Sequence, residues 1–265
     1  MHIELEGMPN TRDLGGMISK DGRKVKKHML LRSGQLYAAT QSDIDILVNE
    51  YNLGLIVDFR SLSEKEEKPD PSIKGVDYIY NPIMKQITKG ITRDKKSDND
   101  TVKMIILDMA NDLKRAEQYM VKMYEDLINN DYALSQYGKF LDLLLTNNYK
   151  AILWHCTAGK DRAGLATVLV LECLGIPRED IINDYLLTNK YVQNDINKMV
   201  NSIKAEYDFP IIEDVVKALF GIKREYMEDV YATIEKEYGS VENFLDKKLG
   251  IDNKKIQIMR EHYLE

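Results

Sequence analysis

Short apolar runs alternate along the chain with longer stretches whose apolar residues recur at helical spacing. Residues 55–57 and 151–154 are apolar runs bounded by glycine or polar residues, a pattern typical of buried strands. Residues 76–80 predict a further strand. Helices are predicted over residues 40–52, 132–148 and 162–174, and the last of these stops at Gly175. Strands alternating with helices predict an α/β fold with a central, mostly parallel sheet flanked by helices.

Three other regions complete the expected organisation. Residues 17–34 are predicted to form a β-hairpin that turns at Asp21-Gly22. Residues 81–130 change from mixed charges to methionine-rich helical spacing, which predicts a helical insertion. Its methionines suit either ordinary core packing or a mobile apolar lid, and both roles are open at this stage. Residues 191–265 predict C-terminal helices, with three or four helices expected after residue 174. Ser240 and Asp252 are expected as the N-caps of the last two.

Composition and charge narrow the possible functions. The chain has 265 residues, enough for one domain spanning 1–265. Its formal net charge of -6 argues against broad nucleic-acid binding, which needs a basic face. The two cysteines are too few for a disulfide framework, and no cluster has the spacing of metal ligands, so neither a metal nor another cofactor is expected. The oligomeric state is left open by the sequence.

The cellular location is also only weakly constrained. The first residues lack the basic and apolar regions of a signal peptide. No apolar run is long enough to predict an integral membrane segment. The default expectation is a cytoplasmic protein, with secretion by a route that needs no signal peptide left open.

The chemistry is concentrated in the segment HCTAGKDRAG, residues 155–164, which joins a predicted strand to a predicted helix. A turn at a helix N-terminus directs backbone N–H groups, and the positive end of the helix dipole, at one point. Such a turn binds anions. The expected phosphate-binding residues are Thr157, Ala158, Gly159, Lys160, Asp161 and Arg162.

Two residues of this segment give it reactivity. Cys156 lies where the helix dipole and the neighbouring cations favour a thiolate, which is a strong nucleophile. Arg162 offers a planar fork that can hold two phosphate oxygens and offset charge in the transition state. A Walker-type nucleotide loop is excluded, because Asp161 stands where that motif needs Ser or Thr. Cys156 is therefore predicted as the nucleophile of a phosphate monoester hydrolase, and Arg162 as its phosphate clamp.

The segment resembles the HC-x5-R signature of protein tyrosine phosphatases. Its form CTAGKDR is similar to that of the bacterial tyrosine/serine and phosphoinositide phosphatases related to the secreted mycobacterial and listerial enzymes. Three further motifs agree with that family and occur in its order: NTRDLGG at 10–16, LRSGQL at 31–36 and VDFRS at 57–61. The resemblance covers roughly residues 7–190. It implies a tyrosine phosphatase-like fold, a phosphocysteine intermediate, and a lid corresponding to residues 81–130.

The same resemblance implies a substrate range. Lys160 and Asp161 look like the residues that give this subgroup activity on phosphotyrosine, phosphoserine/threonine and phosphoinositides. Phosphorylated proteins or phosphoinositides are therefore the expected partners. At position 163 this chain has Ala where relatives usually have Thr or Ser, a hydroxyl that helps the thiolate leave in the second step. A slow enzyme with an initial burst is predicted.

Several roles stay open between alternatives. The general acid is expected to be Asp161 or Asp58, although Asp58 could instead pair with Arg60 or Arg12 and brace the loop. The aspartates of the insertion are weaker candidates: Asp94, Asp98, Asp100 and Asp108. His155, Arg12 and Arg60 are expected to support the site. The sequence also leaves two other functions open: a catalytically weak phosphate- or phosphoinositide-binding protein, and a sulfur-transfer or arsenate-reducing enzyme.

Overall fold

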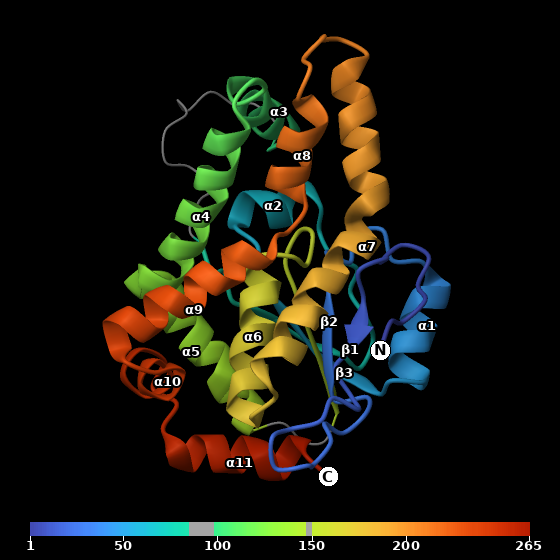
Figure 1. Ribbon diagram of the computed structural model, residues 1–265. Coiled ribbons are helices and arrows are strands. Elements are labelled where there is room, and N and C mark those ends of the chain that lie inside the picture. Colours follow the sequence, from blue (N-terminus) through green and yellow to red (C-terminus); the bar gives the residue numbers. More distant parts are fainter. Residues whose placement is uncertain (85–97, 147–149) are drawn as a thin grey trace.

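A five-stranded sheet with helices on both faces forms the centre of the molecule (Figure 1). The computed structural model describes residues 1–84, 98–146 and 150–265, and only the backbone over 98–101. The strand order is β1-β2-β5-β3-β4. The strands are β1 (Arg12–Asp13), β2 (Leu30–Ser33), β3 (Leu53–Asp58), β4 (Asp77–Tyr80) and β5 (Ala151–His155). Neighbours are parallel except for the pair β1–β2, so the expected mostly parallel sheet is confirmed.

Both faces of this sheet are buried, and successive residues of its inner strands enter different cores. Val57 and Trp154 belong to the larger core, while Ile56 and Leu153 belong to the smaller one. This division follows from the two-residue period of a strand. It also explains why the inner strands read as continuous apolar runs in the sequence.

The helices are distributed unequally between the two faces. Their bounds are α1 (Gln41–Asn49), α2 (Leu62–Glu67), α3 (Asp98–Asp108), α4 (Leu113–Asn129), α5 (Asp131–Leu145), α6 (Arg162–Leu174), α7 (Arg178–Lys204), α8 (Ile212–Phe220), α9 (Arg224–Tyr238), α10 (Val241–Leu249) and α11 (Asn253–Tyr263). Helix α1 packs on the smaller core, and α4 to α11 build the larger one. None of the helices in the described ranges combines the length and the apolar character that a membrane crossing needs.

The hairpin prediction was wrong in its strand partner. The turn itself forms, with Gly22 at a φ of 88° and its amide donating to Ser19 O. Only one bridge follows it, between Ile18 and Lys24. The expected return strand, β2, instead pairs with β1 and β5, because its apolar residues are buried in the sheet interior.

Two helical predictions also need correction. Helix α2 was not foreseen, although Ser61 and Glu64 form the capping box that starts it. After residue 174 the chain, described there without gaps, forms five helices rather than three or four, and the first begins at Arg178, well before residue 191. Ser240 and Asp252 cap α10 and α11 as predicted.

Candidate active site

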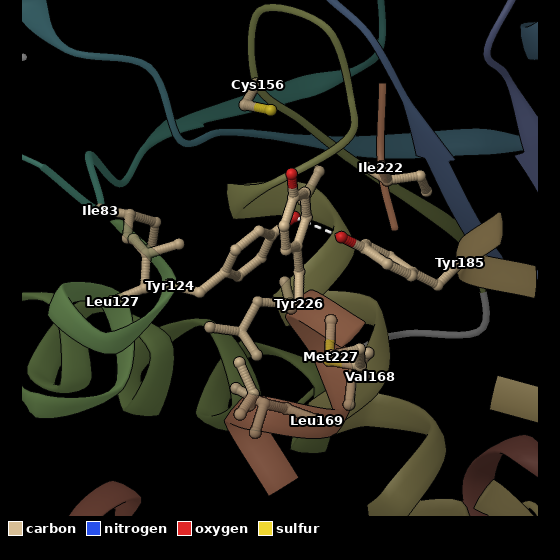
Figure 2. Close-up of a cluster of buried hydrophobic side chains, with 14 of the residues drawn as sticks. Ile83, Tyr124, Leu127, Cys156, Val168, Leu169, Tyr185, Ile222, Tyr226 and Met227 are labelled. Atoms are coloured by element: carbon tan, nitrogen blue, oxygen red, sulfur yellow. Dashed lines mark hydrogen bonds between the residues drawn. The ribbon is translucent and has the colours of Figure 1, made fainter. Parts of the chain in front are cut away.

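The predicted anion-binding loop lies at the carboxyl end of β5, between that strand and the N-terminus of α6. Figure 2 shows Cys156 on the arch of chain that joins the two elements. The parallel register pairs Asp58 of β3 with His155 of β5, so the ends of these strands meet at the same edge of the sheet. Open α/β sheets place their ligand sites at this edge.

Three consecutive carbonyl groups of the loop are held by donors outside it. The bonds run from Gln35 N to Thr157 O (3.0 Å), from Asn10 Nδ2 to Ala158 O (2.8 Å) and from Arg32 Nη2 to Gly159 O (2.8 Å). Because a trans peptide unit is planar, turning each carbonyl outward turns the following amide inward. The amides of residues 158–160 therefore face the interior of the loop, and none of them has an acceptor within the described part of the chain.

Glycine is required at one position of this loop. Gly159 has a φ of 71°, and a Cβ atom there would lie 2.5 Å from Ser33 O on β2. Any side chain would push the loop away from the strand that supports it, so the inward amides depend on this residue.

Cys156 and Arg162 lie at the two ends of the loop. Cys156 is buried, with 2% of its surface exposed. Arg162 is held by Glu64 of α2, with Nη1 donating to Oε2 at 2.6 Å and Nη2 to Oε1 at 2.7 Å. Within the described residues its Nε has no acceptor, so the Nε edge of the guanidinium stays available to an oxyanion.

Glu64 is a site residue that the sequence reasoning missed. Burial opposes its ionisation, but hydrogen bonds and attraction from Arg162 hold the pKa of its carboxyl at about 2. Its side chain also accepts from the Thr157 hydroxyl, so it connects α2 to both ends of the loop. The capping box from Ser61 to Glu64 was a signal for the helix in the sequence, but not for the contact with Arg162.

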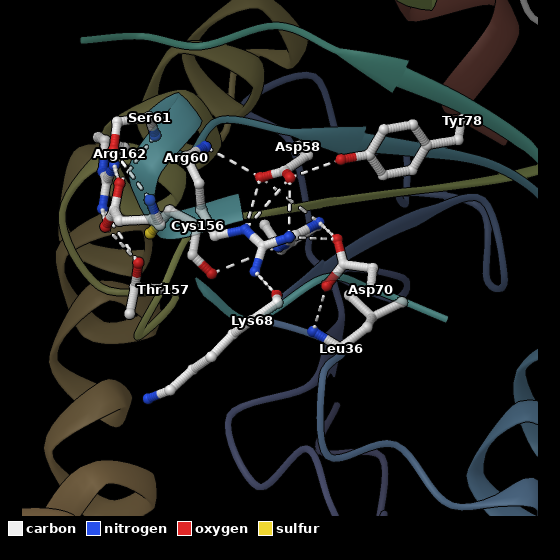
Figure 3. A network of polar contacts seen from close by, with 12 residues as sticks. Leu36, Asp58, Arg60, Ser61, Lys68, Asp70, Tyr78, Cys156, Thr157 and Arg162 are labelled. Atoms are coloured by element: carbon white, nitrogen blue, oxygen red, sulfur yellow. Dashed lines mark hydrogen bonds and ion pairs between the residues drawn. The ribbon is translucent and has the colours of Figure 1, made fainter. Parts of the chain in front are cut away.

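Asp58 lies in a buried polar network and not in the opening of the loop (Figure 3). Its carboxylate accepts from Arg60 Nε and Nη2, at 3.0 and 2.8 Å, and from the Tyr78 hydroxyl at 2.6 Å. Burial opposes ionisation, yet these donors and His155 hold the pKa of Asp58 below its usual value. The expectation that Asp58 acts as general acid does not fit this geometry, because its carboxylate is enclosed and kept ionised. Its bracing role with Arg60 does fit.

His155 joins the same network. Its Nδ1 lies 3.3 Å from Cys156 O, and its Nε2 lies 3.1 Å from Asp70 Oδ2 without forming a hydrogen bond to it. Within the described residues, ligand atoms of Asp58, Asp70 and His155 lie close enough together to hold a metal ion. Arg60 is bonded to both carboxylates, so a guanidinium already contacts them and offsets part of their charge.

Lys160 and Asp161 face the covering helices. Lys160 Nζ donates to Asp161 Oδ1 at 2.9 Å and to Leu219 O, in the last turn of α8, at 3.0 Å. The Tyr124 hydroxyl of α4 also donates to Asp161 Oδ1, at 2.8 Å. Both donors to the Asp161 carboxylate therefore bond to the same oxygen, Oδ1. Within the described residues, Oδ2 has no hydrogen-bond partner.

The cover of the loop differs from the predicted lid. Helices α3, α4 and α8 stand over the end of the sheet where the loop lies (Figure 1). Tyr124 comes from the predicted insertion, but Leu219 comes from a C-terminal helix that was not expected near the site. Among the aspartates of the insertion, Asp108 is an exposed partner of Arg115. Asp94 and the side chains of Asp98 and Asp100 lie outside the described residues.

Arg12, expected in a supporting role, lies behind the loop with Arg32. Both arginines pair with Asp184 of α7, through Arg12 Nε at 3.1 Å and Arg32 Nη1 at 2.8 Å. Sequence reasoning did not single out Asp184, which lies in a helix of mixed charge with no motif around it.

Similarity to known proteins identifies the family to which this chain belongs. The profile of the tyrosine phosphatase family matches residues 3–265. The chain belongs to the tyrosine phosphatase family. It is therefore a phosphatase, and the family assignment sets aside a sulfur-transfer or arsenate-reducing enzyme.

Individual relatives support the assignment. A Cupriavidus necator protein assigned to the tyrosine-protein phosphatases is 26% identical over 264 residues, covering 99% of this chain and 88% of that one. The triple specificity protein phosphatase PtpB of Mycobacterium tuberculosis is 29% identical over 153 residues, covering 55% of this chain and 54% of that one. A tyrosine-protein phosphatase of Nostoc commune is 22% identical and covers 87% of this chain and 72% of that one.

A solved structure is more distantly similar. The catalytic domain of the PP-IP phosphatase Siw14 from S. cerevisiae has a TM-score of 0.36 and 12% identity, covering 77% of this chain and 96% of that one. A match this loose adds nothing to the fold described above.

Proposed function

We propose that this phosphatase hydrolyses phosphate monoesters through a phosphocysteine intermediate formed on Cys156. The observation that carries the proposal is the set of three outward carbonyls, which leaves three consecutive amides facing the loop interior. These amides, with the N-terminus of α6, can hold the oxygens of a phosphate in front of the Cys156 sulfur. In the first step the thiolate forms an S–P bond while the P–O bond to the leaving group breaks. In the second, water breaks the S–P bond and releases phosphate.

Arg162 is proposed as the phosphate clamp. Glu64 occupies one edge of its guanidinium and fixes its plane, while the Nε edge is left for a phosphate oxygen. A guanidinium placed in advance stabilises the transferring phosphoryl group without reorganising during the reaction. Glu64 is thus a positioning residue that acts through Arg162.

Asp161 is proposed as the general acid. Lys160 and Tyr124 both donate to its Oδ1, which leaves Oδ2 as the oxygen that can carry the transferable proton. That proton would pass to the leaving oxygen in the first step, and the carboxylate would accept a proton from water in the second. Asp58 is not proposed for this role, because its enclosed carboxylate is bonded to Arg60 and Tyr78.

The proposed substrates are phosphotyrosine first, with phosphoserine/threonine and phosphoinositides as further classes. Support comes from Lys160 and Asp161, which belong to the CTAGKDR form of the loop whose family resemblance implies these three substrate classes. The relative named a triple specificity protein phosphatase gives further support. A phosphorylated protein or a phosphoinositide would then be the partner of the site.

The direct test is release of phosphate from p-nitrophenyl phosphate by wild type and by Cys156→Ser. Activity that disappears in the variant supports the mechanism. Equal activity in both would overturn it, and absence of activity in wild type with retained oxyanion binding would favour the phosphate-binding alternative. A Malachite Green screen of phosphopeptides and phosphoinositides, with Cys156→Ser as the blank, then ranks the substrates.

A further inference from the structure

Two of the three contacts that orient the loop carbonyls lead back to one carboxylate, that of Asp184 on α7. In the first path, Asp184 binds Arg12, Arg12 Nη1 donates to Asn10 Oδ1, and Asn10 Nδ2 donates to Ala158 O. In the second path, Asp184 Oδ2 accepts from Arg32 Nη1 at 2.8 Å, and Arg32 Nη2 donates to Gly159 O. The two paths end on adjacent peptide units of the anion-binding loop.

We propose that Asp184 is a positioning residue that sets the oxyanion affinity of the loop by fixing both of these paths. The contacts of Asp184 with the loop run through the two arginines that it binds. The inference rests on the proposed role of the loop as the oxyanion site. It adds a residue of α7, outside the four motifs of the sequence, to the groups that determine binding.

Burial makes this arrangement depend on Asp184. The side chains of Arg12 and Arg32 are each 1% exposed, and that of Asp184 is 11% exposed. Two buried guanidinium groups share this one carboxylate, and without it they would repel each other with little screening. Burial and the nearby Arg12 charge lower the pKa of Arg32 to about 10, while Asp184 acts in the opposite direction.

Arg32 has little freedom to replace the lost contact. Its Nη1 and Nη2 are bonded to Asp184 and to Gly159 O, and its Nε is buried without an acceptor in the described residues. The side chain also lies against Gly164 at the start of α6, where a Cβ would be 3.5 Å from Nη2. If Arg32 moves away from Arg12, it must release the carbonyl of Gly159, and the next amide then loses its inward direction.

Orientation and simple charge predict opposite results for Asp184→Asn. Removing a negative charge near an anion site would tighten anion binding if charge alone mattered. Loss of orientation would weaken it, because inward amides at a preorganised oxyanion site are worth about tenfold or more each. The sign of the change therefore separates a positioning role from an electrostatic one.

The experiment is titration of wild type, Asp184→Asn and Thr188→Val with tungstate, by calorimetry, with Tm, kcat and KM for p-nitrophenyl phosphate measured in parallel. Thr188→Val is the matched control, since it removes a hydrogen bond to Arg12 Nη2 (3.2 Å) while Asp184 stays in place. We expect the tungstate Kd and the KM to rise about tenfold or more in Asp184→Asn. The control is expected to stay within about twofold of wild type.

A folded Asp184→Asn that binds tungstate as tightly as wild type, or more tightly, would overturn the inference. If that variant does not fold, Asn10→Ala interrupts one path only and is expected to raise the tungstate Kd several-fold. An unchanged Kd in Asn10→Ala would also overturn the inference. Wild type that neither binds tungstate nor hydrolyses the ester would instead refute the proposed function. The two failures are therefore distinguishable.

Discussion

At the scale of single residues, the site is determined by which oxygen of each carboxylate is already occupied. Both oxygens of Glu64 are taken by Arg162, and the oxygens of Asp58 are taken by Arg60 and Tyr78. Asp161 has both of its partners on Oδ1. These hydrogen bonds distinguish the three acidic residues close to the loop, and they support the proposed roles of clamp support, brace and proton donor.

The Asp161→Asn variant tests the proton-donor role. With an alkyl phosphate, whose leaving oxygen needs a proton, we expect kcat to fall about 10²–10⁴-fold and the alkaline limb of the pH–rate profile to disappear. With an activated ester such as p-nitrophenyl phosphate, whose leaving group needs no proton, the loss in the burst rate is expected to be much smaller. Asp58→Asn serves as the comparison, and a similar dependence on the leaving group in that variant would assign the acid to Asp58 instead.

The alanine at position 163 predicts a slow second step. Its side chain is fully buried at the start of α6 and supplies no hydroxyl to assist the departing thiolate. Wild type should therefore show a burst of one equivalent of p-nitrophenol followed by slower turnover. We expect Ala163→Ser to raise the steady-state rate and leave the burst rate unchanged. Stopped-flow absorbance measures both, and an unchanged steady-state rate would contradict the prediction.

At the scale of elements, helices far apart in the sequence are attached to the loop through its own charged residues. Lys160 donates to the last turn of α8, where a cation is favoured by the helix dipole. Tyr124 connects α4 to Asp161, and Tyr185 of α7 bonds to Tyr124 at 2.7 Å. Lys160 and Asp161 of the loop thus also anchor the helices α8 and α4 that cover it.

Lys160→Met is expected to loosen α8. The substitution removes the bond to Leu219 O and the favourable charge at the helix end, which together are worth about 1 kcal/mol. Amide hydrogen exchange in the last turn of α8 should become several-fold faster, while exchange in α6 stays as in wild type. Lys217→Met is the matched control, because Lys217 lies on α8 but pairs with Glu213 at the exposed surface. Equal effects of the two substitutions would refute the attachment.

At the scale of the whole molecule, buried carboxylates make the fold sensitive to acid. Asp58, Glu64 and Asp184 all have a pKa held below its usual value by buried arginines, despite the opposing effect of burial. A carboxyl whose pKa is lowered on folding contributes stability above its unfolded pKa and loses it as the pH falls toward the folded value. These three residues lie around the loop, so acid should loosen this end of the sheet.

Glu64→Gln measures one part of this effect. The pKa of Glu64 is about 2 in the fold and 4.5 in its unperturbed state, a difference worth about 3 kcal/mol. The advantage of wild type over Glu64→Gln in unfolding free energy should be constant above about pH 5 and shrink by this amount as the pH falls to about 2. Urea unfolding across this range is the measurement. A difference that does not vary with pH would show that Glu64 is not specifically stabilised as a carboxylate.

The sequence by itself determined the fold class, the inner strands β3 and β5, the helix α6 and the identity of the loop between them. Apolar runs and helical spacings are local patterns, and the loop motif is contiguous, so a single segment carries each signal. It also favoured Asp58 and Asp161 as general acid over the aspartates of the insertion, without deciding between the two. The hairpin prediction at residues 17–34 was wrong because β2 is an inner strand. It pairs with β1, which lies before residue 17, and with β5, which lies far along the chain.

Only the tertiary structure decided which distant residues hold the loop. Glu64, Asp184 and Leu219 contact or support it from α2, α7 and α8, at sequence separations that no local pattern encodes. The proposal of Asp161 over Asp58 as general acid also rests on the tertiary structure, because the surroundings of a carboxylate determine whether it can release a proton. Residue types and local periodicity supply the chemistry of this site, and long-range packing determines the direction and charge state of each group.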